Sequence, residues 1–304
     1  MAPQNLFITC IFLFSLLNPF HLSHAHSHNS NAKNHPSPLS AINNLVGVRK
    51  GQKAKGLVEL KTHLSNLGYM KNNNNEAKAN NDLFDDDLEL AIKKYQVFFH
   101  LNVNGILDAK TVEHLLLPRC GVADFVNLNA SQFKNEIPTI ASHYTFFPGE
   151  PKWPPGKTNL TYSFPPGASN EVMQAIKDAT QLWAGVTHFK FTYITDYDHA
   201  DIKISFQVWD HKDGAAFDGR GGILAHAFAP SDGRLHFDGD EVWVDGVVPG
   251  KFDLQMVGLH ELGHVLGLGH TTDGGAIMTP TLGSGFRKGL GQDDINGIKA
   301  LYHL

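Results

Sequence analysis

Apolar residues at helical spacing predict a small bundle of helices between residues 51 and 117. The first helix is expected from Leu57, Leu60, Leu64 and Leu67, which lie three or four positions apart. Gly68 follows and is suited to end it. The second helix is expected from Leu88, Leu90, Ile92, Tyr95 and Phe98. Asp108 can cap a short third helix, whose apolar positions are Val112, Leu115 and Leu116.

The second half of the chain has a different pattern. Strands are predicted over residues 160–164, 189–194 and 202–208, and an amphipathic helix capped near Ser169 over residues 170–183. Two further helices are expected, one around residues 260–265 and one over residues 293–302. Strands mixed with three helices predict an α+β domain with a mixed, twisted sheet, preceded by a small all-α domain.

Composition agrees with a globular protein of two modest domains. The 304 residues are 42% hydrophobic and 18% charged, and 25 Lys and Arg face 30 Asp and Glu. The net charge is therefore −5, and no basic block interrupts the sequence. A nucleic-acid partner is not expected.

The N-terminus predicts a secreted protein. The apolar run from Leu6 to Leu17 is too short to span a bilayer, and Ser23 and Ala25 occupy the −3 and −1 positions of a signal-peptidase site. We predict a signal peptide at residues 1–25, with an uncleaved anchor as the alternative.

A polar tail follows the signal peptide, and two glycosylation sequons fit an extracellular location, in the apoplast or the extracellular matrix. Residues 26–50 are rich in His, Asn and Ser and are predicted to be a disordered tail. The glycosylation sequons begin at Asn129 and Asn159. No apolar segment follows Leu304, so no membrane span is expected.

The segment His260–His270 carries the densest metal chemistry of the chain. His260 and His264 lie four residues apart, so a helix places both imidazoles on one face. Glu261 is placed to act on water beside the metal without being a ligand. Gly267 allows the chain to turn and bring His270 round as a third ligand. Three imidazoles and one open position indicate a catalytic zinc.

The sequence after these histidines extends the pattern. Thr271 follows the third histidine, and Met278 lies seven residues further on. The whole segment resembles the metzincin peptidases, and within them the matrixins, or matrix metalloproteinases. Residues 147–153 resemble the start of the catalytic domain in the plant-type members. The resemblance covers residues 50–304 and implies that Met278 forms the floor of the zinc site. Thr279 departs from the family, which usually has tyrosine there.

Cys120 lies in a segment, residues 118–124, that resembles the cysteine switch of matrixin pro-segments. The resemblance implies that Cys120 occupies the fourth zinc position in a latent form, while Arg119 and Asp124 pair to hold the segment in the cleft. Ala123 replaces the usual proline and predicts a looser loop. The bundle before it resembles a peptidoglycan-binding-like fold, and a carbohydrate-binding module is the alternative.

The resemblance also implies further metal sites in the loops before the histidine motif. A structural zinc would be held by His211, Asp213, His226 and His236. Calcium would be held by Asp218, Gly219, Gly221, Ile223, Asp238 and Glu241. A second calcium would use Asp201 and a loop that is shorter here than in many relatives. The alternative for all of them is a polar surface loop.

The predicted protein is a latent zinc endopeptidase that cleaves internal bonds of extracellular proteins. By resemblance, residues 222–225 form an edge strand for substrate, and Met256 and Leu282 line an S1′ pocket for hydrophobic P1′ residues. Glu261 is the expected general base.

The expected domains are the signal peptide, the tail, the pro-domain at 51–117, a switch and linker at 118–143, and the catalytic domain at 144–304. We expect zinc and calcium as cofactors, a monomer, and the propeptide as the enzyme's own inhibitor. A catalytically silent binding protein and another metzincin family are the alternatives. The intact histidine and glutamate set argues against the former. Cys120 and the Thr271-to-Met278 spacing argue against the latter.

Overall fold

The computed structural model describes residues 38–71, 81–125 and 143–304. The predicted signal peptide, the sequon at Asn129 and nearly all of the predicted linker after residue 125 lie outside the described residues. Within the described ranges, none of the helices combines the length and the apolar character needed to cross a membrane.

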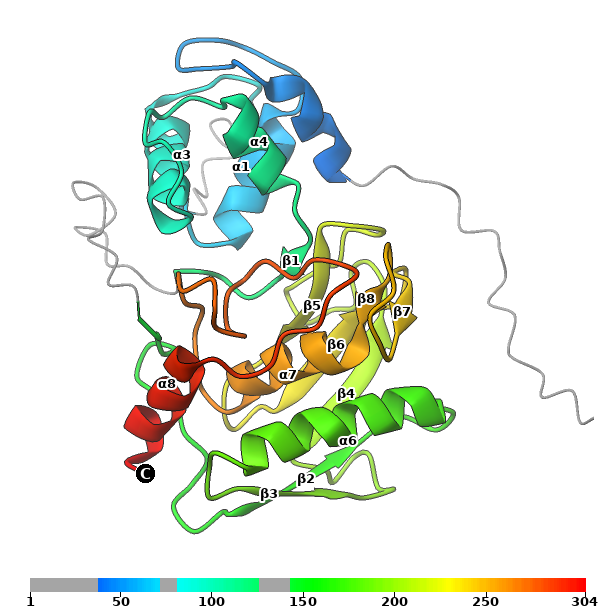
Figure 1. Cartoon of the computed structure of the whole chain (residues 1–304). Helices are drawn as coiled ribbons and strands as arrows, with labels where there is room; N and C mark the ends of the chain where they lie inside the picture. Colours follow the sequence, from blue (N-terminus) through cyan, green and yellow to red (C-terminus); the bar gives the residue numbers. More distant parts are fainter. Residues whose placement is uncertain (1–37, 72–80, 126–142) are drawn as a thin grey trace, which may run out of the picture. The chain divides into compact units, whose positions relative to one another are not determined.

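The helical region matches the predicted bundle and begins earlier than predicted. Its helices are α1 (Leu57–Asn66), α3 (Asp86–Phe98) and α4 (Ala109–Leu115) (Figure 1). The side chains of Asp85 and Asp108 cap α3 and α4 by accepting backbone N–H groups. The apolar faces meet in one core that includes Leu57, Leu60, Leu64, Leu88, Ile92, Tyr95 and Val112.

The predicted disordered tail does not extend to residue 50. A 3-10 helix, η1 (Pro38–Leu45), packs against α1 and α4. Leu39, Ile42 and Leu45 are buried in the same core. The polar composition of residues 26–50 concealed three apolar side chains at helical spacing, and burying them stabilises this segment. The remaining tail, before residue 38, lies outside the described residues.

A six-stranded mixed sheet forms the scaffold of the second half. In the order β1-β5-β6-β4-β2-β3 it contains β1 (Arg119–Cys120), β5 (Ile223–Ala227), β6 (Arg234–Asp238), β4 (Ile202–Gln207), β2 (Asn159–Ser163) and β3 (Lys190–Tyr193). Only the β5–β6 pair is antiparallel. The three strands predicted from alternation are β2, β3 and β4. A separate pair joins β7 (Trp243–Val244) to β8 (Phe252–Asp253).

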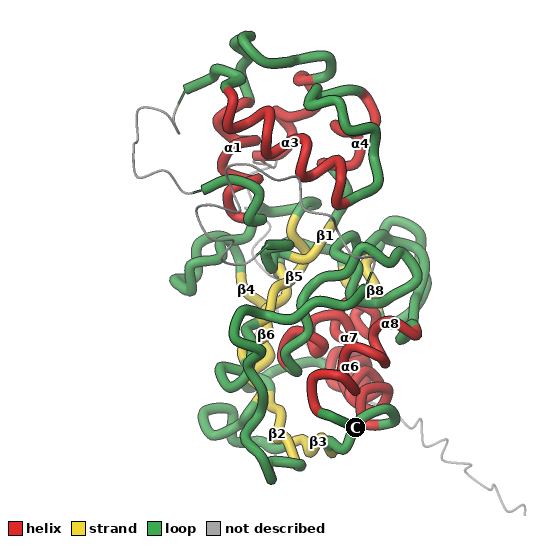
Figure 2. The backbone as a smooth tube through the Cα atoms, turned by 90° about the vertical axis from the view of Figure 1, so that its left-hand side faces the viewer, coloured by secondary structure: helices red, strands yellow, loops and turns green. Residues whose placement is uncertain are grey.

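Three helices lie on one side of this sheet: α6 (Asn170–Ala184), α7 (Leu254–Val265) and α8 (Gln292–Tyr302) (Figure 2). Ser169 caps α6 as predicted. The helices α6 and α7 pack closely at Gly258, where a Cβ atom would lie 2.5 Å from Cδ1 of Ile176. The indole N–H of Trp183 also donates to the backbone oxygen of Leu259 at 2.8 Å. These contacts fix α7, and with it the histidine motif, against α6.

Candidate active site

The helix α7 presents His260 and His264 on one face, and the turn after it presents His270. The helix ends at Val265, and Gly267 has a φ angle of 105°, a conformation that favours glycine. The turn at Gly267 therefore reverses the chain as the sequence predicts. All three histidines are buried.

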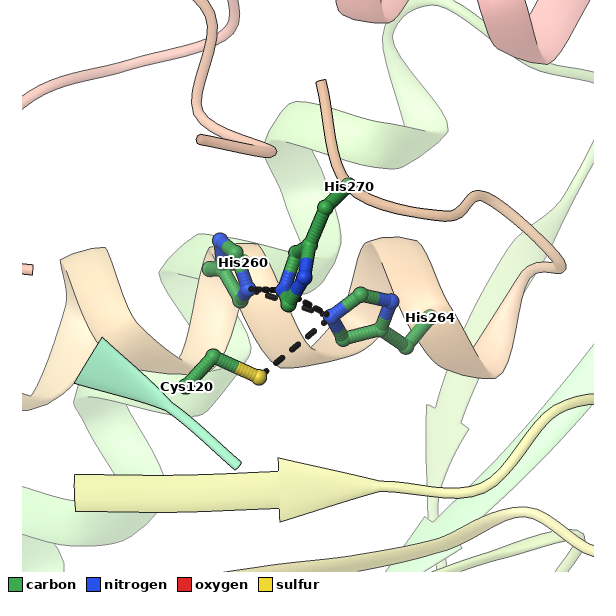
Figure 3. Close-up of side chains that lie close together, drawn as sticks. All are labelled: Cys120, His260, His264 and His270. Carbon is green, nitrogen blue, oxygen red and sulfur yellow. Dashed lines mark hydrogen bonds between the residues drawn. The ribbon is translucent and has the colours of Figure 1, made fainter. Parts of the chain in front are cut away.

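The three Nε2 atoms converge on one point (Figure 3). They lie 3.1 Å (His260–His264), 3.2 Å (His264–His270) and 3.3 Å (His260–His270) apart. Nitrogens bound tetrahedrally to zinc at about 2.05 Å would lie about 3.3 Å apart. The spacing therefore fits a shared zinc ion.

The hydrogen bonds of two of the three Nδ1 atoms support the same conclusion. Nδ1 of His260 faces the backbone oxygen of Ile277 at 2.7 Å, and Nδ1 of His264 faces that of Leu268 at 2.8 Å. A carbonyl oxygen only accepts, so each Nδ1 carries the proton and each Nε2 carries a lone pair. Burial lowers the pKa of both imidazoles well below the usual value, so they stay neutral. Lone pairs this close repel unless a cation lies between them.

Cys120 completes this group from the pro-segment. Its Sγ lies 3.4 Å from Nε2 of His264, and the four ligand atoms lie within 4.8 Å of one another. Burial and the neighbouring Glu261 raise the pKa of the thiol well above its usual value. A bound zinc ion would reverse this shift, because a coordinated thiol loses its proton.

The strand that carries Cys120 forms backbone hydrogen bonds on both of its sides. On one side β1 pairs in parallel with β5, which is therefore not an edge strand here. On the other side, the N–H of Cys120 donates to the oxygen of Pro280 at 2.9 Å, and the N–H of Leu282 donates to the oxygen of Pro118 at 2.8 Å. A peptide that pairs with β5 must displace this strand.

Glu261 is buried beside the histidines. Neither of its carboxylate oxygens has a hydrogen-bond partner in the described part of the chain. Burial raises the pKa of this carboxyl to about 8. A buried carboxyl with a pKa near neutrality, next to the Cys120 thiol, is suited to exchange protons with a reactant.

The segment around Met278 lies beneath the histidines and is fixed by α8. Asp294 accepts the N–H groups of Ile277 at 2.7 Å and Met278 at 3.0 Å. The Ile277 oxygen in turn holds His260. Asp294 lies in the first turn of α8, and nothing in its sequence position signals this role.

A second group of ligands forms around Asp213, as the resemblance implies. Oδ2 of Asp213 lies 2.7 Å from Nε2 of His211, 2.8 Å from Nε2 of His226 and 2.9 Å from Nδ1 of His236. The four side chains are at most 8% exposed. Four protein ligands leave no open position, which is the arrangement of a structural zinc.

The carboxylates expected to bind calcium influence one another's pKa values, but their oxygens do not converge as closely as the ligand atoms of the two histidine groups. Burial raises the pKa of Asp218 to about 7, of Asp238 to about 6 and of Glu241 to about 7. Repulsion from Asp238 contributes to the shifts of Asp218 and Glu241, and repulsion from Asp240 contributes to that of Asp238. Oδ2 of Asp238 is buried and has no hydrogen-bond partner within the described ranges, and the N–H of Ile223 donates to Asp218. Among described residues, only the two histidine groups bring their ligand atoms within 4.8 Å of one another.

The carboxylate of Asp201, expected at a second calcium site, is already paired. It lies 2.7 Å from Nζ of Lys157 and accepts both the N–H and the hydroxyl of Thr161 at 2.8 Å. An ammonium group thus neutralises this carboxylate. No sequence pattern connects Lys157 with Asp201, because the two residues are 44 positions apart.

The remaining predicted residues lie in three places. Met256 and Leu282 are both buried in the core of the second half while the pro-segment is in place. Gly219 and Gly221 both have positive φ angles, in the loop before β5. Asn159 is exposed at the start of β2, and its side-chain oxygen accepts the hydroxyl of Thr192 at 2.9 Å.

Comparisons with known proteins agree with this geometry. Residues 152–303 match the matrixin family, and residues 53–115 match the putative peptidoglycan binding domain. The chain is 45% identical to metalloendoproteinase 1 of Glycine max over 264 residues, which cover 84% of each protein. It is 40% identical to metalloendoproteinase 2-MMP of Arabidopsis thaliana over 86% of this chain and 74% of that protein. Human neutrophil collagenase is 41% identical over 70% of this chain and 43% of its own length. The chain belongs to the matrixin family of zinc metalloendopeptidases.

Proposed function

We propose that this matrixin is a secreted, latent endopeptidase of extracellular proteins, silenced by its own Cys120. One observation carries the proposal: Sγ of Cys120 lies within the ligand group of three histidines, in a strand that pairs on both of its sides. The thiolate in the fourth position would exclude water from the metal. The strand around it would exclude substrate.

Removal of that strand would prepare the enzyme for substrate. A substrate peptide would then pair with β5, antiparallel to it, and its backbone would be aligned beside His260, His264 and His270. Zinc held by these histidines supplies Lewis acidity for the carbonyl and the attacking water. Glu261 would accept the proton of that water and pass it to the leaving amine.

Specificity would arise next to this site. The N–H of Met256 is held by the Asp253 carboxylate at 2.7 Å, in the first turn of α7, and Leu282 belongs to the segment that contacts the pro-segment. Both side chains are apolar and neither brings a charge. We infer a preference for Leu, Ile or larger hydrophobic residues at P1′.

Two further kinds of metal site would stabilise the catalytic domain. The closed group around Asp213 would hold a structural zinc. The carboxylates of Asp218, Asp238 and Glu241, with the carbonyl groups of Gly219, Gly221 and Ile223, would hold calcium, which prefers oxygen ligands. The raised pKa values of the three carboxyls mean that a bound cation would stabilise their charged forms. Because Lys157 pairs with Asp201, we propose one calcium rather than two.

Activation would proceed by release of Cys120 and cleavage near residue 143. Lys134 is the only Lys or Arg between residues 121 and 150, so a paired-basic processing site is absent from that stretch. The N–H of Tyr144 already donates to Oδ1 of Asp293 at 3.0 Å, while Oδ2 is buried and has no hydrogen-bond partner among the described residues. A new terminal ammonium at this position would satisfy that oxygen. The neighbouring Asp294 is already occupied by the backbone around Met278.

The domain boundaries and location follow from the same proposal. A signal peptide at residues 1–25 would direct the chain to the apoplast or extracellular matrix, where Asn129 and Asn159 are available for glycosylation. The pro-domain would include η1, and the switch and linker would separate it from a catalytic domain that begins near Tyr144. A monomer is expected, with the propeptide as its inhibitor.

The general base provides the test of this function. Glu261→Ala in the activated enzyme should retain its zinc, because Glu261 is not a ligand, and should lose peptidase activity by about 10²–10⁴-fold. Metal content and hydrolysis of a fluorogenic peptide would be measured on the same preparation. A variant that retains most of the wild-type rate would exclude Glu261 as the base.

A further inference from the structure

The three histidines of the active site differ in what holds their second nitrogen. His260 and His264 are held by backbone oxygens of Ile277 and Leu268, which belong to the catalytic domain. His270 is held by a side chain of the pro-segment, because its Nδ1 lies 2.8 Å from Oδ1 of Asp124. Cleavage after the switch segment would therefore remove this partner from His270 alone.

Asp124 is the centre of a buried polar cluster. Its Oδ1 also accepts Nη2 of Arg119 at 2.6 Å, and its Oδ2 accepts the hydroxyl of Tyr69 at 2.6 Å. The backbone N–H of Asp124 donates to the oxygen of Leu67 at 3.0 Å. Asp124 is 9% exposed, and its three side-chain partners are 2% exposed or less. Hydrogen bonds in such a dry cluster are strong and directional.

Tyr69 belongs to the helical region and is rigidly packed there. Its ring makes edge contacts with Tyr95, Phe98 and Phe125 at centroid distances of 5.2, 6.3 and 5.2 Å. A ring fixed on these sides places its hydroxyl accurately. A continuous chain of hydrogen bonds thus runs from the helical pro-domain through Asp124 to His270.

We propose that the residues before the catalytic domain hold the metal centre at two points. Cys120 acts on the metal itself and Asp124 acts on the ligand His270, and Tyr69 is the positioning residue for Asp124. This inference rests on the proposed zinc site. A carboxylate on Nδ1 fixes the tautomer of a ligating histidine and makes its other nitrogen a better ligand. The proform should therefore bind its catalytic metal more tightly than ligation by Cys120 alone explains. The helical pro-domain should contribute to this higher affinity.

A different result is expected if Asp124 acts only as the ion-pair partner of Arg119. If Asp124 served only to hold the switch strand, its loss would release Cys120, and Tyr69 would have no effect on the metal. A measurement that separates thiolate ligation from metal release distinguishes the two. Cobalt(II) provides it, since a cobalt–thiolate bond has its own charge-transfer absorption and the group around Asp213 contains no cysteine.

The experiment uses the chain from residue 26 with Glu261→Ala to prevent self-cleavage, loaded with cobalt(II). The amplitude of the thiolate absorption reports Cys120 ligation, and its decay after addition of 1,10-phenanthroline reports metal loss from this site. Tyr69→Phe and Asp124→Asn are compared with the parent. Tyr95→Phe is the matched control, because it removes a buried hydroxyl of the same aromatic cluster that contacts His114 rather than Asp124.

Tyr69→Phe should retain the thiolate absorption and lose metal about 3–10-fold faster than the parent, a part of the 10–100-fold typical for loss of a histidine's carboxylate partner. Asp124→Asn should be faster still, and Tyr95→Phe should match the parent. Equal decay in the parent, Tyr69→Phe and Asp124→Asn would overturn the inference and leave the latent peptidase intact. A parent without thiolate absorption would remove the proposed switch, and this inference with it.

Discussion

Gly263 and Met278 are in contact across the floor of the active site. A Cβ atom on Gly263 would lie 2.3 Å from Sδ of Met278 and 3.1 Å from the indole of Trp183. The helix α7 can therefore rest on the methionine only because residue 263 has no side chain. The contact links the histidine motif to the segment that family resemblance identified as its floor.

We predict that Gly263→Ala destabilises the protein although alanine favours helices. The gain in helix propensity is about 1 kcal/mol, whereas overpacking a filled core costs about 1–3 kcal/mol. Since Met278 is 2% exposed and cannot move into solvent, the clash should win. Thermal unfolding would show a lower midpoint, and a second substitution, Met278→Val, should recover part of the loss. A more stable Gly263→Ala variant would contradict this packing.

The group around Asp213 should account for one of two zinc ions in each chain. Asp213→Ala removes the oxygen that contacts all three histidines, so zinc content should fall from two to one per chain, with a lower unfolding midpoint. Asp210→Ala is the matched control, because Asp210 is an exposed carboxylate in the same loop. Metal analysis after dialysis measures the ratio. Two zinc ions in Asp213→Ala would show that the group holds none.

Met256 should set the depth of the S1′ pocket. Met256→Arg would place a long cationic side chain at the pocket mouth, and the preference should change from large to small P1′ residues. The ratio of kcat/KM for peptides with P1′ Leu and P1′ Ala should fall by about 10-fold or more, since each lost methylene contact is worth about 1 kcal/mol. An unchanged ratio would place the pocket elsewhere.

Sequence patterns predicted the elements of this protein well, because their signals are local. Helical spacing at Leu57 to Leu67 and a cap at Ser169 require no knowledge of distant residues. The prediction of a disordered tail was wrong at η1, because Leu39, Ile42 and Leu45 lie within a stretch of polar composition. A few apolar side chains are sufficient to order a segment when a core is available.

The sequence indicated the candidate metal ligands, but it did not indicate the residues that hold those ligands in position. His260, His264 and His270 have diagnostic spacing, and Cys120 was found through resemblance. Asp294 under Met278, Lys157 beside Asp201 and Tyr69 beside Asp124 are ordinary residues in sequence. Their roles depend on the tertiary fold, which brings Tyr69 to a carboxylate 55 positions away.

The size of the proform with and without a mercurial tests the account most directly. The chain from residue 26 should stay near full length until the mercurial withdraws the Cys120 thiolate, and should then shorten to begin near Tyr144. Cys120→Ser should shorten without treatment, and Glu261→Ala should resist shortening in either background. An intact wild-type proform that is fully active, or a Cys120→Ser form that stays latent, would contradict the proposed switch.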